Sequence, residues 1–310
     1  MFYYGRVRIE YREEPCKVAL NHVRGMPFDW SLNPYMGCVH RCTFCYVRAF
    51  ERRADRPSDH RYGTSIRVKV NIAERLRAEL ARASWRGEHV VIGAATDPYQ
   101  PAEGRYRLTR ACIEVLRDAS NPFDIITRGP LVVRDAELLA EAAARADVSV
   151  TFSVPTVDDD VWRTTEPGTA PPRQRLRALK ALVAAGVRAS VGMAPLLPGL
   201  SDHPSSLERV VRAAREAGAC GIWANLLYLR PGTREHFLEC LARDCPSFCR
   251  AMSGCIRGAP TSPSPLHGPR RKKYVGWRSF TVSMTAGPSS SARPSATNSF
   301  RCFRHRIQPT

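Results

Sequence analysis

Apolar and polar positions alternate along the middle of the chain in a way that predicts strands separated by helices. Short apolar runs of strand length are followed by longer segments with apolar residues at helical spacing. The expected strands are residues 28–38, 89–96, 123–128, 148–156, 187–199 and 220–230, and the expected helices are residues 70–83, 109–120, 134–146, 171–186 and 204–218. Continuous apolar strands are typical of a parallel sheet that is covered on both faces. The pattern therefore predicts an α/β fold, built as a parallel barrel or partial barrel of six strands.

Residues with reactive or polar side chains follow these apolar runs. In parallel barrels the functional site lies at the C-terminal ends of the strands. The residues at these positions are Cys38, Cys42, Cys45, Thr96, Asp97, Thr127, Arg128, Ser153, Thr156, Met193, Asn225 and Arg230. We therefore expect one site that draws on several strand ends.

The first of these positions carries three cysteines at the spacing CxxxCxxC, within residues 33–50. Three thiolates on one short loop can hold a [4Fe–4S] cluster and leave one iron open to a small molecule. The alternative is a structural zinc site completed by His40 or another histidine. Structural zinc usually draws on paired CxxC halves, which disfavours this alternative.

Length and composition set further bounds. The 310 residues, 44% hydrophobic and 25% charged, can bury a core as one large or two small domains. No apolar run approaches the roughly 18 residues that span a bilayer, and the N-terminus lacks the order of a signal peptide. We therefore expect a soluble cytoplasmic protein without a membrane partner. In a reducing compartment the eleven cysteines indicate a metal site rather than disulfides.

The formal net charge of +18 is concentrated near one end. Residues 245–310 hold eleven Lys or Arg and no Asp or Glu, and subtracting those charges leaves +7 for residues 1–244. We divide the chain into an N-terminal extension (1–27), a core domain (28–244) and a basic, low-complexity tail (245–310). The tail is expected to be irregular or disordered, and two interpretations of it stay open. It is either a solvated tail that binds nucleic acid, or a run translated in a shifted reading frame, which we favour because it starts abruptly after a helical segment.

Three motifs together resemble the radical S-adenosylmethionine (radical SAM) superfamily, in the branch related to spore photoproduct lyase. They are GCVHRCTFCY at residues 37–46, ATDPYQPAE at residues 95–103 and FSVPT at residues 152–156. The resemblance runs from about Phe28 to Phe237. It implies a partial six-stranded barrel and a [4Fe–4S] cluster held by Cys38, Cys42 and Cys45, with SAM chelating the open iron. One electron from the cluster would cleave SAM to methionine and a 5′-deoxyadenosyl radical that abstracts hydrogen from a substrate.

The resemblance also implies contacts to SAM. Phe44 and Met193 would pack near the adenine, Thr96 or Asp97 would bind the amino group, and Ser153 would reach the ribose or the carboxylate. A carboxylate such as Asp97 suits the cationic sulfonium and ammonium groups. Each residue also has an ordinary structural interpretation: Asp97 precedes Pro98 and starts a turn, Ser153 ends a strand, and Phe44 and Met193 belong to the core.

Three classes of function stay open at this point. The first is a radical SAM enzyme that acts on an unknown substrate, which is a nucleic acid, a peptide or a small molecule. This enzyme would take electrons from a reductant such as flavodoxin or ferredoxin. The second is a DNA photoproduct lyase, and the third is a non-enzymatic iron–sulfur or zinc protein that binds nucleic acid. Spore photoproduct lyase is understood to use a cysteine as hydrogen donor. Neither Cys112, in an expected helix, nor Cys220, at the start of an expected strand, matches that position, which disfavours the lyase.

Overall fold

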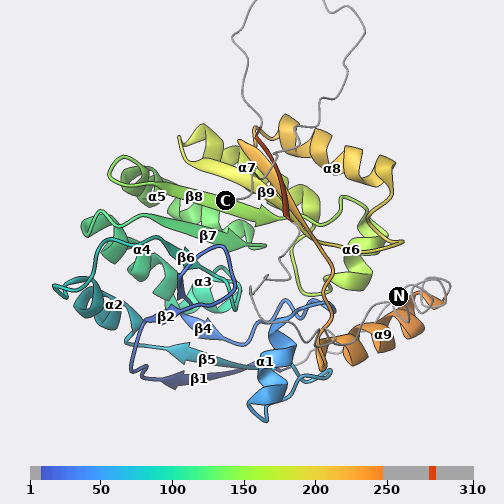
Figure 1. Cartoon of the computed structure of the whole chain (residues 1–310), viewed down its shortest axis with the longest axis horizontal. Helices are drawn as coiled ribbons and strands as arrows, with labels where there is room; N and C mark the ends of the chain where they lie inside the picture. The colour runs from blue at the N-terminus through green and yellow to red at the C-terminus, as the bar shows by residue number, and fades with distance from the viewer. Residues whose placement is uncertain (1–7, 247–278, 284–310) are drawn as a thin grey trace, which may run out of the picture.

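The computed structural model describes residues 8–246 and 279–283 of the chain. Within these residues the strands form an eight-stranded sheet, in the order β11-β10-β9-β8-β7-β6-β3-β2, and a three-stranded sheet, in the order β1-β5-β4 (Figure 1). The strands are β1 (Glu10–Glu14), β2 (Leu20–His22), β3 (Trp30–Leu32), β4 (Tyr35–Met36), β5 (Ser65–Lys69), β6 (Val90–Ile92), β7 (Phe123–Thr127), β8 (Val148–Ser153), β9 (Arg188–Leu196), β10 (Gly221–Leu226) and β11 (Ser279–Ser283). The helices are α1 (Val47–Arg53), α2 (Ile72–Leu80), α3 (Ala102–Tyr106), α4 (Leu108–Asp118), the 3-10 helix η1 (Pro130–Asp135), α5 (Ala136–Ala143), α6 (Asp159–Thr165), α7 (Pro172–Ala184), α8 (Pro204–Glu216) and α9 (Thr233–Asp244).

The large sheet contains the predicted run of parallel strands. Strands β3, β6, β7, β8, β9 and β10 pair in parallel, each with the next along the chain. Strand β2 flanks this run at one edge and β11 at the other, both antiparallel. The predicted α/β fold with six parallel strands is therefore confirmed. Because all six strands run the same way, their C-terminal ends meet at one edge of the sheet.

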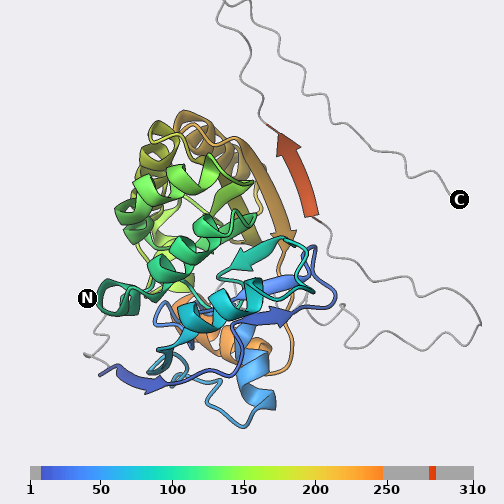
Figure 2. The same ribbon diagram turned by 90° about the vertical axis from the view of Figure 1, so that its left-hand side faces the viewer.

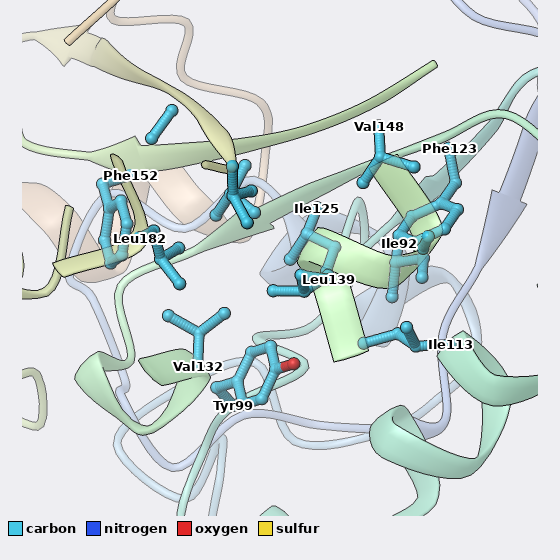
Figure 3. Close-up of a cluster of buried hydrophobic side chains, with 14 of the residues drawn as sticks. Ile92, Tyr99, Ile113, Phe123, Ile125, Val132, Leu139, Val148, Phe152 and Leu182 are labelled. Atoms are coloured by element: carbon cyan, nitrogen blue, oxygen red, sulfur yellow. The ribbon is translucent and has the colours of Figure 1, made fainter. Parts of the chain in front are cut away.

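The core lies between the sheet and the helices. Successive side chains of a strand point to opposite faces, and in β8 the residues Val148, Val150 and Phe152 belong to the core while Ser149 and Thr151 point the other way. Figure 3 shows Val148 and Phe152 of β8 and Ile125 of the neighbouring strand β7, together with Leu139 of α5. The helices drawn in green and yellow cover this face (Figure 2). In β8 the opposite face of the sheet carries the polar residues Ser149 and Thr151.

The helix ends follow local chemistry. Helix α7 starts at Pro172, where the missing N–H costs no hydrogen bond, and Gly186 follows its end with a φ of +82°. Helix α6 is capped by Asp158, whose side chain accepts from the backbone N–H groups of Asp160 and Val161. These caps fix the position of α6, which reaches the site described below.

The small sheet was not expected. Strand β1 pairs in parallel with β5, more than fifty residues further along, and β5 pairs antiparallel with β4. Strand β5 has five residues, of which Ile66, Val68 and Lys69 are buried. The pairing matters for the site, since β4 leads directly into the three cysteines.

Most of the basic tail, residues 247–278 and 284–310, lies outside the described residues. The two interpretations of the tail, a nucleic-acid-binding segment and a shifted reading frame, concern these residues. Residues 279–283 form β11 on the edge of the large sheet. Among the residues that the structure does describe, no helix combines the length and the hydropathy needed to cross a lipid bilayer.

Candidate cluster and cofactor site

The three cysteines lie on a tight loop, residues 37–46, between β4 and α1, which we call the cysteine loop. Cys38 and Cys42 are buried and Cys45 is half-buried. Two turns shape the loop: the N–H of Arg41 donates to Cys38 O (3.3 Å) and the N–H of Cys45 donates to Cys42 O (3.2 Å). Gly37, with a φ of +86°, permits the change of direction at its start. The spacing CxxxCxxC thus places the cysteines on successive turns.

Distant segments wrap the loop closely. The N–H of Gly168, after α6, donates to His40 O (3.1 Å), and a Cβ at Gly168 would lie 2.5 Å from Val39 O. A Cβ at Gly63 would lie 2.3 Å from Cys38 O. Side chains larger than hydrogen do not fit at either position without backbone movement. The loop is therefore enclosed by backbone on two sides.

Arg48 supports the loop from α1. Its side chain is buried, although arginines on helices are expected to be solvated. The guanidinium donates to four backbone carbonyls, those of Arg41, Cys42, Ser58 and Asp59, at 2.7 to 3.4 Å. It also lies 4.5 Å from the centre of the Tyr62 ring, whose hydroxyl is 3.6 Å from Cys45 Sγ. Arg48 therefore ties the loop to the segment that follows α1.

Thr96 and Gln100, which follow β6, hold the start of the loop. The Thr96 hydroxyl donates to Gly37 O (2.7 Å) and accepts from Gln100 Nε2 (2.9 Å). Gln100 Nε2 also donates to Gly37 O, and Gln100 Oε1 accepts from the N–H of Val39. Thr96, predicted as a contact to SAM, is thus engaged with the cysteine loop.

Asp97 joins the loop to the end of β7. Its carboxylate accepts from the N–H of Tyr99, the hydroxyl of Thr127 and the N–H of Arg128, at 2.6 to 2.9 Å. Asp97 Oδ2 also lies 3.2 Å from His40 Nδ1. Burial alone would raise the pKa of Asp97, but the charge of His40 and these hydrogen bonds lower it to about 2. Burial likewise disfavours a charged His40, yet Cys38 and Asp97 raise the pKa of His40 to about 10.

The Asp97 carboxylate makes folding dependent on pH. Because its folded pKa of about 2 lies below the ordinary 3.8, its contribution is complete above pH 4 and is lost as the pH falls through 2. We expect the metal-free protein to lose about 2 kcal/mol of unfolding free energy over this range through Asp97. Urea unfolding measured from pH 5 to pH 2 should show that the unfolding free energy of Asp97→Asn falls less than that of the wild type. Asp160→Asn, at a side chain 94% exposed, should parallel the wild type, and parallel curves for Asp97→Asn would contradict the assignment.

The other predicted cofactor contacts lie in different places. Phe44 is buried beside Cys42 and Phe237, and the Arg128 guanidinium lies 5.7 Å from the centre of its ring. Ser153 ends β8 at the same edge of the sheet. Met193 shares its face of β9 with the core residues Ala189 and Val191, so it packs toward the helices. The structure thus places Phe44, Thr96 and Asp97 on or against the cysteine loop, Ser153 at the same edge of the sheet, and Met193 in the core.

A buried ionic group beside the loop was missed by sequence reasoning. Arg128 Nε donates to Glu166 Oε1 (2.6 Å), and Arg175 Nη1 lies 3.1 Å from both carboxylate oxygens of Glu166. The side chains of Glu166 and Arg175 are fully buried and that of Arg128 is 19% exposed. Arg175 also donates to Ser153 O, and Arg128 to Ala194 O. We call this group the Arg128–Glu166–Arg175 triad. The one signal for it in the sequence was the position of Arg128 directly after an expected strand.

The donor set fits an iron–sulfur cluster. Three thiols are present on one loop, and thiolates are the usual protein ligands of such clusters. Burial raises the pKa of the Cys42 and Cys45 thiols, so a bound metal is needed to keep both as thiolates at neutral pH. Within residues 8–246 and 279–283, no three His, Cys, Asp or Glu side chains gather closely enough to hold a single metal ion.

Comparison with known proteins agrees with the motifs. The family described as the radical SAM superfamily matches residues 32–205. An uncharacterized protein of Mycobacterium tuberculosis is 39% identical over 258 residues, which are 82% of this chain and 76% of that protein. A radical SAM Nalpha-GlyT isomerase of Pseudomonas phage M6 is 25% identical over 171 residues, 55% of this chain and 34% of the isomerase.

Among solved structures, spore photoproduct lyase complexed with dinucleoside spore photoproduct is similar to this chain, with a TM-score of 0.57 and 15% sequence identity. The match covers 76% of this chain and 66% of the lyase, slightly less than two thirds of its length. At this identity the likeness shows a shared fold.

Proposed function

Because the chain belongs to the radical SAM superfamily, whose members use a [4Fe–4S] cluster and SAM, we propose that it is an enzyme that cleaves SAM reductively and abstracts hydrogen from a substrate. The observation that carries this proposal is the cysteine loop itself: three cysteines held at the C-terminal edge of a parallel sheet. When bound, the cluster and SAM would supply a 5′-deoxyadenosyl radical. A flavodoxin or ferredoxin is the proposed class of electron donor.

The surrounding residues have distinct proposed roles. Cys38, Cys42 and Cys45 would hold the cluster. Phe44 and Ser153 stay proposed contacts to SAM, and Arg128 is added to them because its guanidinium is partly exposed at the same edge and suits a carboxylate. The polar atoms of Thr96 and Asp97 already bond to the loop and to β7, so we propose that these residues position the cysteines.

The enclosure of the loop favours radical chemistry. A primary-carbon radical reacts with most nearby C–H bonds, so the site must exclude water and stray side chains. Backbone at Gly63 and Gly168 and the aromatic rings of Phe44 and Phe237 surround the cysteines.

A DNA photoproduct lyase is the alternative that shares this chemistry. Cys112 is fully buried among the helices, and Cys220 is exposed at the N-terminal end of β10, opposite the edge where the cysteine loop lies. Neither is placed to donate hydrogen to a substrate radical. We therefore propose hydrogen abstraction from an unidentified substrate. The third class of function, a zinc or iron–sulfur protein without enzymatic activity, is tested by the following experiment.

The test is anaerobic reconstitution with iron and sulfide, reduction with dithionite and addition of SAM. We expect 5′-deoxyadenosine and methionine, measured by liquid chromatography. The Cys38→Ala variant, treated identically, should form neither. Intact clusters in the wild type without any 5′-deoxyadenosine would refute the enzyme, and zinc bound in place of iron would support the third class of function.

A further inference from the structure

The Arg128–Glu166–Arg175 triad carries one more positive than negative charge in a site from which water is largely excluded. Its two arginines share a single carboxylate, and the side chains of Glu166 and Arg175 are fully buried. The nearest other carboxylate, that of Asp97, is engaged by His40, by Thr127 and by backbone N–H groups. An uncompensated charge in such a site is costly, so the excess is expected to match an anionic group that binds there.

A second buried network in the same molecule shows the contrast. Glu103 and Asp135, both fully buried, pair with Arg110 and Arg134. Arg110 also lies 3.2 Å from Glu114, so this network, which we call the balanced network, has no excess positive charge. The imbalance of the triad is therefore a local property and not a general consequence of the arginine-rich composition.

The excess charge lies next to the cysteine loop. The Arg128 guanidinium is 5.7 Å from the Phe44 ring, and Phe44 packs with Cys42. A thiolate, and any iron–sulfur cluster that the thiolate holds, therefore lies in the field of this arginine.

We infer that the triad sets the reduction potential of the cluster, with Arg175 as a positioning residue that keeps Glu166 from neutralising Arg128. This inference rests on the proposed function, because it requires the cluster. One electron from an external reductant adds one negative charge to the cluster, and a nearby buried positive charge stabilises that reduced form. Arg175 binds both oxygens of Glu166, so the carboxylate is divided between two cations and Arg128 keeps a net positive field.

The experiment measures the midpoint potential of the reconstituted full chain without SAM, by redox titration followed with electron paramagnetic resonance. Glu166→Gln removes the negative charge and should favour reduction, raising the potential. Arg175→Met leaves Glu166 to neutralise Arg128 and should lower the potential. We expect at least a tenfold change of the reduction equilibrium in each direction, about 59 mV for a one-electron couple.

Controls separate this effect from a structural role. Arg128→Lys keeps the charge and should keep the potential close to that of the wild type, and Arg110→Met, in the balanced network, should not shift it. If Arg175→Met does not fold, Arg128→Met takes its place and must also lower the potential. If Glu166→Gln and Arg175→Met bind less cluster but do not shift the midpoint potential in opposite directions, the triad has a structural role only and the inference is wrong.

Two kinds of failure are distinguishable. Clusters that assemble in all variants but show equal potentials overturn the inference and leave the proposed function standing. A wild-type chain that binds no [4Fe–4S] cluster overturns both. Shifts of the expected sign in a protein that never forms 5′-deoxyadenosine support the inference and refute the enzyme.

Discussion

Replacing Cys42 with alanine is expected to abolish cluster binding, with loss of the broad absorption near ~400 nm and of all 5′-deoxyadenosine formation. In the proposed site one iron of the cluster has no protein ligand, so removal of one of three thiolates would leave two iron atoms unliganded by protein. Cys42 is buried beside Phe44, in a hydrophobic cluster against which Cys45 and Cys245 also pack. Iron and sulfide analysis after anaerobic reconstitution measures the loss.

The matched control is Cys220→Ala. Cys220 is exposed at the opposite end of the sheet, so the variant should bind as much iron as the wild type. A Cys42→Ala protein that retains its iron and its chromophore would show that the cluster is held elsewhere. Equal loss in both variants would point to general instability and count against the assignment.

Arg48→Met is expected to lower the free energy of unfolding by about 3 kcal/mol and to reduce the iron bound on reconstitution. The change keeps much of the side-chain volume but leaves the buried carbonyl of Cys42 and the partly buried carbonyls of Ser58 and Asp59 without this donor. Urea unfolding of the metal-free protein gives the energy, and iron analysis gives the occupancy.

Arg53→Met, on the same helix, provides the comparison. Arg53 is exposed in the last turn of α1 and packs over Phe50, so its loss should change stability by less than about 0.5 kcal/mol. Similar losses for both variants would mean that Arg48 acts only through helix propensity or net charge, and not through the carbonyls it binds.

The six parallel strands of the large sheet could be predicted from the sequence because their signal is local, whereas the edge strands β2 and β11 were not predicted. Apolar runs and helical spacing repeat along the chain, and each strand pairs with the next one, so chain order gives spatial order. The small sheet lacked this advantage. Strand β1 is five residues of mostly charged sequence, and its partner β5 lies far along the chain.

The residues of the site divide in the same way. The positions of Cys38, Cys42 and Cys45 follow from one motif, and those of Asp97 and Ser153 from the ends of their strands. The orientation of Met193 was also accessible, because Ala189, Val191 and Met193 alternate with Ser190 and Gly192 along β9.

The buried arginines could not be predicted. Arg48 and Arg175 lie on helices, where pattern alone predicts solvent exposure. Their burial depends on backbone carbonyls and a carboxylate that only the folded chain brings to them, as for Arg175 with Ser153 O and Glu166. Likewise, the engagement of Thr96 with Gly37 O joins residues 59 positions apart.

Two supports of the cysteine loop come from late in the chain. Thr43 donates to the carbonyl of Thr165, 122 residues away, and Thr233 donates to that of Cys45 across 188 residues. During synthesis the cysteines leave the ribosome long before these partners exist. Arg48, Thr96 and Gln100 can hold the nascent loop early, but the contacts from Thr165 and Thr233 are added only when α6 and α9 have been made. The proposed metal-binding site near the beginning of the chain is therefore completed late in synthesis.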